Sequence, residues 1–247
     1  MPDPSLIVLI CATFFLAGLV KGIVGMGLPT VSLALLAATL GLTQAMALML
    51  VPSLVTNLWQ ALRGGRLKEI LIRFWPFLLV GVAVTVALTH LIQLSNPAVL
   101  KALLGLIICL YAGISLLSVK LPAPKTREKA WAVTMGALNG ICTGLTGTFV
   151  IPSVAYFQSL NLDKNHLVQA MGVWFSVATI ALAFGLGRQG LVPADLGLLS
   201  ALGLVPALLG MGIGERCRQH LSEATFKKVF YLGLMAVGVF ILWRAWS

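Results

Sequence analysis

The chain has 247 residues, of which 59% are apolar and only 10% are charged, and its net charge is +10. A soluble domain is usually about 45–50% apolar and about 25% charged, so the composition indicates an all-α, polytopic integral membrane protein. The positive charge does not predict a nucleic-acid partner, because the basic residues lie in short segments between apolar runs. No segment outside these runs is long enough to fold alone, so we expect a single transmembrane domain over residues 1–247.

Apolar runs bounded by charged residues and proline predict the membrane spans. Runs of about 20 residues cross a bilayer as helices, and slightly shorter ones are adequate. The runs are residues 44–62, 70–92, 98–119, 167–187, 196–214 and 229–246. Together with the two broken regions described next, the sequence predicts about 8 spans.

Two regions carry short apolar runs separated by glycine. Residues 6–20 and 30–40 flank one glycine-rich break, and residues 131–144 and 148–160 flank another. Each pair fits either two short tilted spans or a hairpin that enters and leaves the membrane on one side. The sequence leaves these two alternatives open.

The basic residues predict the orientation of the spans. They concentrate in the connections 63–68, 120–129 and 216–228, whereas the connections 93–97 and 188–193 carry at most one basic residue. Short connections rich in lysine and arginine face the cytoplasm. We therefore expect a multi-pass protein of the cell (inner) membrane, with the basic connections inside and both termini outside.

The two halves of the chain repeat each other, with one repeat over about residues 5–119 and the other over about 130–246. The matching pairs are Gly18 with Gly136, Gly22 with Gly140, Thr30 with Thr148 and Arg63 with Arg188. The charge of the connections puts the two arginines on opposite sides of the membrane. The sequence therefore predicts an inverted repeat, which many alternating-access transporters share.

Lys21 is the most unusual residue at membrane depth. A charge there costs at least ~2.5–3.5 kcal/mol on insertion scales, and the adjacent glycine break frees backbone N–H groups that need a partner. We interpret Lys21, with Gly25 and Gly27 of the break, as candidate binding residues for a small anionic substrate. The alternative is that the Lys21 side chain extends to the nearer membrane surface.

Hydroxyl side chains surround the two breaks. Thr30 follows the first break, and Thr143, Thr146, Gly147 and Thr148 surround the second. Hydroxyls and free N–H groups at the start of a half-helix suit a small oxyanion. The alternative is that the threonines bond to carbonyls of their own helix.

Asn139 occupies the position in the second half that Lys21 occupies in the first. It is either a neutral substrate-binding partner or an interhelical hydrogen-bonding residue. The second-rank polar candidates are Gln44, Asn57, Gln60 and Gln169. Among the glycines, we expect Gly18 and Gly136 to pack helices together, and those at positions 25, 27 and 147 to shape the breaks.

The repeated Gly-xxx-Gly-xx-Gly run resembles the TauE/SafE family of sulfite and organosulfur exporters. The resemblance is carried by Gly18, Gly22, Gly25 and Gly27 in the first half and by Gly136, Gly140, Gly147 and Pro152 in the second. The second copy keeps only the last of three consecutive glycines that the family often shows. The resemblance implies a membrane transporter, and the family covers several substrates.

These observations predict a secondary transporter of a small anion such as sulfite, a sulfonate or an organic acid, working by alternating access and not as an enzyme. We expect no cofactor, no metal and no nucleic acid. The expected partners are the anionic substrate and the lipid bilayer, and a homo-oligomer is possible. One alternative is an intramembrane enzyme, for which the sequence offers no convincing serine–histidine pair. The other is a transmembrane thiol–disulfide electron carrier using Cys11 and Cys142, which the repeat does not place in equivalent positions.

Overall fold

The chain folds into helices joined by short links. The computed structural model describes residues 3–119, 121–122, 127–218 and 222–246, and within these ranges it contains helices and no strands. The first half comprises α1 (Pro4–Val24), α2 (Leu28–Thr39), α3 (Leu42–Leu62), α4 (Leu67–Thr89), α5 (Leu91–Leu94) and α6 (Pro97–Leu116). The second half comprises α7 (Glu128–Thr146), α8 (Ser153–Ser159), α9 (Lys164–Arg188), α10 (Ala194–Cys217) and α11 (Glu223–Trp246).

The long helices are suited to a bilayer. In the described part of the chain, seven helices are long and apolar enough to cross a membrane, and α7 is nearly as long, with 19 residues. Large apolar side chains such as Trp75, Leu79, Val205 and Leu232 are exposed on these helices. Such a surface is stable against lipid because its side chains are apolar, and a helix pairs most of its backbone groups internally. The prediction of an all-α, polytopic membrane protein is confirmed.

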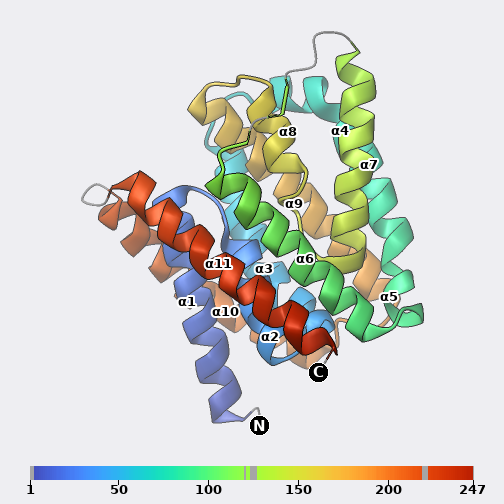
Figure 1. The fold of residues 1–247 in the computed structure, drawn as a ribbon, viewed down its shortest axis with the longest axis vertical. Helices are drawn as coiled ribbons and strands as arrows, with labels where there is room; N and C mark the ends of the chain where they lie inside the picture. The colour runs from blue at the N-terminus through green and yellow to red at the C-terminus, as the bar shows by residue number, and fades with distance from the viewer. Residues whose placement is uncertain (1–2, 120, 123–126, 219–221, 247) are drawn as a thin grey trace.

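The first half begins with a long helix and a short helix that form a hairpin. α1 ends at Gly25, whose φ of 86° is readily adopted only by glycine. The short helix α2 begins after Gly27 and returns to the end of the molecule at which α1 begins (Figure 1). The helix is therefore longer than the apolar run 6–20 that predicted it. It continues to Val24, and Lys21 lies in its last turn.

The second half repeats this hairpin in the opposite direction. α7 ends at Gly147, whose φ is 72°, and residues 147–152 form no helix. The short helix α8, with seven residues, then returns toward the end at which α7 begins (Figure 1). Each broken pair is thus a hairpin with one long and one short arm.

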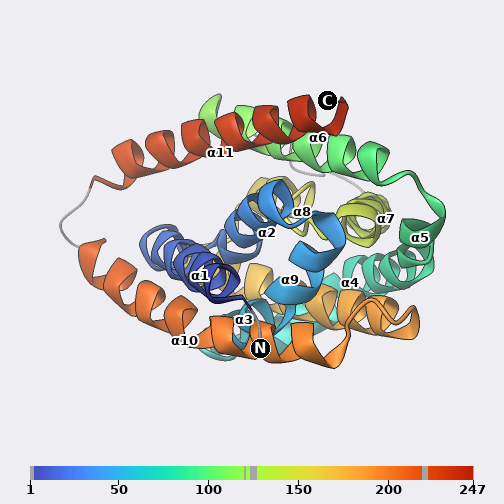
Figure 2. The same cartoon turned by 90° about the horizontal axis from the view of Figure 1, so that it is seen from below.

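The main helix pairs each join one helix of the first half to one helix of the second half. α1 packs against α10, as α7 packs against α4, while α3 packs against α9 and α6 against α11. Figure 2 shows α6 and α11 side by side as one layer next to the hairpins. α1 rises from the lower end in Figure 1, and α7 descends from the upper end. This arrangement agrees with the inverted repeat predicted from the sequence.

Glycines allow the paired helices to approach closely. A Cβ atom on Gly18 would lie 2.1 Å from the carbonyl oxygen of Ala207 on α10, and one on Gly136 would lie 2.6 Å from that of Phe77 on α4. Both separations are shorter than any real contact of this kind. The expected packing role of these two glycines is therefore confirmed.

A proline interrupts α3 in the middle of the membrane domain. Pro52 has no N–H group, so the carbonyl of Leu48 loses its partner within the helix. Ser200 of α10 donates to that carbonyl at 2.7 Å and accepts from the N–H of Val51 at 3.1 Å. One serine from the second half thus supplies the hydrogen bond that Pro52 cannot make, and it connects α3 to α10 at this point.

Of the described residues in the basic connections, Arg63 and Arg218 line the same cavity at one end of the molecule. Arg66, between α3 and α4, lies 3.3 Å from the carboxylate of Asp163, which precedes α9. At the other end, Gln93 donates to the carbonyl of Gln189 at 2.9 Å, and on this side α1 begins and α11 ends (Figure 1). Residues 120, 123–126 and 219–221 of the predicted basic connections, and the chain ends 1–2 and 247, lie outside the described residues.

Candidate substrate-binding site

Lys21 is enclosed by protein. It is only 4% exposed, and its Nζ donates to Oγ1 of Thr56 at 3.2 Å and to Oδ1 of Asn57. Because α1 continues to Val24, the lysine is held on the helix and packed against α3. The alternative in which Lys21 extends to a membrane surface is therefore not what the structure shows.

One face of α3 supplies the partners of Lys21. Ser53, Thr56, Asn57 and Gln60 are spaced three or four residues apart, which places them on one side of a helix. The hydroxyl of Thr56 donates to the carbonyl of residue 52 at 2.7 Å, so its oxygen is free to accept from the ammonium. An ammonium has three N–H donors, and α3 takes two of them. The third is available for a substrate.

A cavity of about 450 Å³ adjoins the lysine, lined by residues of α1, α3, α9 and α10. Lys21, Gly25 and Thr56 lie along its wall, and Arg63 and Gly64 mark the basic end of the molecule. Gly25 contributes bare backbone, since a Cβ atom built there would meet nothing within 4 Å. The cavity therefore connects the basic end with a buried ammonium.

The charged residues around the cavity favour an anion. Arg63 and Arg218 line it together with Lys21, against the single carboxylate of Glu215 among its described lining residues. The guanidinium of Arg63 lies 3.7 Å from the centre of the Trp59 ring, which orders it. A cleft with an excess of one charge and low-dielectric walls concentrates ions of the opposite charge.

The sequence analysis missed several of these residues. Thr56 adjoins a second-rank candidate, Asn57, and its place on the same helix face as Gln60 was the signal that could have found it. Arg218 was assigned only to the basic connection 216–228, and Glu215 was not singled out, because their place beside Lys21 depends on the packing of α10.

Two predicted residues of the first break lie away from the cavity wall. Gly27 has a φ of 110° and precedes α2, where a Cβ atom would lie 3.4 Å from Cγ1 of Val20. Thr30 is buried in the first turn of α2. Neither belongs to the residues that line the cavity beside Lys21.

The polar residues of the second break bond to one another and to backbone. Asn139 donates to the carbonyl of Phe149 at 3.1 Å, and Thr143 donates to the carbonyl of Thr148 at 3.1 Å. The hydroxyls of Thr146 and Thr148 are 2.9 Å apart. These bonds hold residues 147–152 in place.

The second break lies at a different depth from Lys21. A Cβ atom on Gly147 would lie 2.9 Å from Cγ of Met46 on α3. Met46 precedes Asn57 by about three turns, or roughly 16 Å at about 1.5 Å per residue. The structure therefore does not bring the predicted residues of the two halves into one site.

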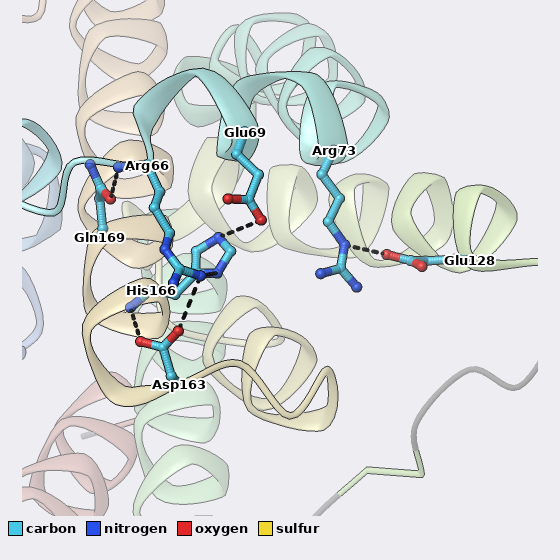
Figure 3. Close-up of polar contacts among 7 residues, drawn as sticks. All are labelled: Arg66, Glu69, Arg73, Glu128, Asp163, His166 and Gln169. Atoms are coloured by element: carbon cyan, nitrogen blue, oxygen red, sulfur yellow. Dashed lines mark hydrogen bonds and ion pairs between the residues drawn. The ribbon is translucent and has the colours of Figure 1, made fainter.

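Ion pairs tie the two halves together beside the cavity (Figure 3). Nη1 of Arg66 lies 3.3 Å from Asp163 and 3.4 Å from Nδ1 of His166, whose Nε2 is 3.9 Å from Glu69. The backbone N–H of His166 donates to the Asp163 carboxylate, and this bond, with Arg66 nearby, holds the pKa of Asp163 below its usual value. Gln169 also accepts from the backbone N–H of Arg66 at 3.0 Å. The start of α4 is thereby fixed to the start of α9.

Comparison with known proteins identifies the family. A sequence model described as "Sulfite exporter TauE/SafE" matches residues 10–241. The match spans nearly the whole chain, so the protein belongs to this family of membrane transporters, as the glycine runs suggested. No curated protein and no solved structure gave a significant match.

Proposed function

We propose, from this family membership, that the protein is a secondary transporter that moves a small sulfur oxyanion, sulfite or a compact sulfonate, across the cell membrane. The observation that carries the proposal is the buried ammonium of Lys21 beside a cavity of about 450 Å³. A charge at membrane depth is expensive and is seldom present without a use. A buried ammonium bound to neutral groups supplies the positive charge that an anion needs.

The size and polarity of the cavity support a small, hydrophilic substrate. Its volume is at the low end of the range of ligand pockets, about 300–1,000 Å³. Gly25 offers open backbone beside Lys21, and Thr56 and Gln60 add polar groups to the wall. A trigonal or tetrahedral oxyanion accepts hydrogen bonds from such groups on several sides.

The charge distribution supports an orientation with the cavity facing the cytoplasm. Arg63 and Arg66 stand at the end where the cavity opens, and basic connections stay on the cytoplasmic side. In this orientation the substrate enters Lys21's cavity from inside the cell. When the two inverted halves exchange conformations, the site opens to the other side, which is the alternating-access mechanism.

The proposal is tested by measuring sulfite binding to the purified protein by calorimetry. Lys21→Met removes the charge at similar length and should bind at least about tenfold more weakly, because a hydrogen bond to a charged group is lost. Lys21→Arg should recover part of the affinity, since it keeps the charge but changes the geometry. Lys101→Met is the matched control, because Lys101 lies at the opposite end of the molecule. Wild-type affinity in Lys21→Met would exclude Lys21 from the site.

A further inference from the structure

Two buried polar atoms on α3 have no hydrogen-bond partner among the described residues. They are Oγ of Ser53 and Nδ2 of Asn57, and both side chains are fully buried. Buried polar groups in proteins are nearly always paired, so each exception calls for a physical explanation. The two atoms lie one helical turn apart on the same face of α3.

Both groups can donate: the NH₂ group of Asn57 only donates, and the hydroxyl of Ser53 can donate as well as accept. The amide of Asn57 turns its oxygen to Lys21, because an ammonium only donates, and its NH₂ group must therefore point elsewhere. Most buried serine and threonine hydroxyls nearby donate to a carbonyl of their own helix: Thr56 does so at 2.7 Å and Ser176 at 2.8 Å. Ser53 makes no such bond. Its hydroxyl is left to donate to something else.

The position of the two donors continues the path of the cavity. Gln60 and Thr56 line the cavity from the basic end inward, and Ser53 lies one turn further in on the same helix face. Lys21 lies at the junction, bonded to Thr56 and Asn57. The two unpaired groups therefore lie on the helix that holds Lys21, Asn57 bonded to it through the amide oxygen and Ser53 one turn further from the basic end.

We infer that Ser53 and Asn57 form an inner subsite in which the anion is held when it is sealed from the cavity. This inference rests on the proposed function. The Ser53 hydroxyl and the Asn57 amide each donate to an oxygen of the anion, while Lys21 balances its charge. The ligand class is an oxyanion with at least two unprotonated oxygens; a cation is excluded, because Lys21 would repel it.

The test compares Ser53→Ala with Ser176→Ala by the melting temperature of the free protein and by calorimetric binding of sulfite. Ser53→Ala removes a buried donor that has no protein partner, so the free protein should melt at the same temperature or higher. Its affinity for sulfite should nevertheless fall about tenfold or more. Ser176→Ala removes a hydroxyl that is also buried but already paired, and it should bind like the wild type.

A second variant tests the amide donor of the subsite separately from the serine. Asn57→Asp keeps an oxygen for Lys21 but replaces the NH₂ donor by an anionic oxygen, so sulfite binding should be lost while the protein remains folded. Unchanged affinity in Ser53→Ala, with binding still dependent on Lys21, would overturn the inner subsite and leave the proposed function intact. Absence of sulfite binding by the wild type would contradict the proposed function and the subsite together.

Discussion

The ammonium of Lys21 is held by neutral groups, and this choice of partners has a consequence for binding. Thr56 and Asn57 satisfy two of its donors without carrying charge. A carboxylate partner would cancel the positive charge and remove most of its attraction for an anion. With a hydroxyl and an amide as partners, the lysine is oriented without a carboxylate bonded to it.

Sequence could identify Lys21 but not its environment. A lysine inside an apolar run is visible in one dimension, because its cost does not depend on the fold. Which residues meet it depends on where the packing of α1 on α10 and α2 places it relative to α3, and short-range patterns do not encode that arrangement. For the same reason the threonines of the second break were grouped with Lys21, although they bond within their own segment.

At the residue scale, the close approach of α1 to α10 predicts the effect of a single methyl group. Gly18→Ala places a Cβ atom against the backbone of Ala207 and should lower the free energy of unfolding by about 1–3 kcal/mol. Gly212→Ala on α10 is the matched control, because a Cβ atom there meets nothing within 4 Å. Thermal and denaturant unfolding in detergent measure both. Equal stability of the two variants would mean that α1 and α10 are not in close contact.

At the element scale, the helix pairings show how far a repeat can be read from sequence. The glycine pairs predicted two equivalent hairpins, and both hairpins are present, with α1 and α7 running in opposite directions (Figure 1). Their ends were misjudged, because a glycine in the left-handed conformation ends each helix later than the apolar run suggests. The pairing of α1 with α10 and of α7 with α4 could not be derived, since it joins segments remote in sequence.

The opposite direction of α3 and α9 leads to a labelling prediction. Arg63 follows α3 and Arg188 ends α9, and both are exposed. In a background with the four native cysteines replaced, we expect Arg188→Cys to react with a membrane-impermeant maleimide in intact cells. Arg63→Cys should react only after the membrane is permeabilised. The reverse pattern would invert the orientation, and identical behaviour of the two sites would refute the antiparallel arrangement.

At the scale of the whole molecule, the structure presents one conformation of a transport cycle. The cavity beside Lys21 opens at the basic end, where ion pairs fix the start of α4 to the start of α9. Alternating access, as proposed above, requires a second conformation in which the same site opens at the other end. The inverted pairing of the helices allows the two halves to exchange roles, so that both conformations use the same kinds of contact.

The central claim, that the protein transports a small sulfur oxyanion through the Lys21 site, is tested most directly by counterflow in proteoliposomes. Vesicles loaded with unlabelled sulfite and diluted into radiolabelled sulfite should accumulate label with the wild type and with Lys101→Met. Lys21→Met vesicles should take up no more label than protein-free vesicles. Wild-type uptake equal to that of protein-free vesicles, or full uptake by Lys21→Met, would contradict the claim.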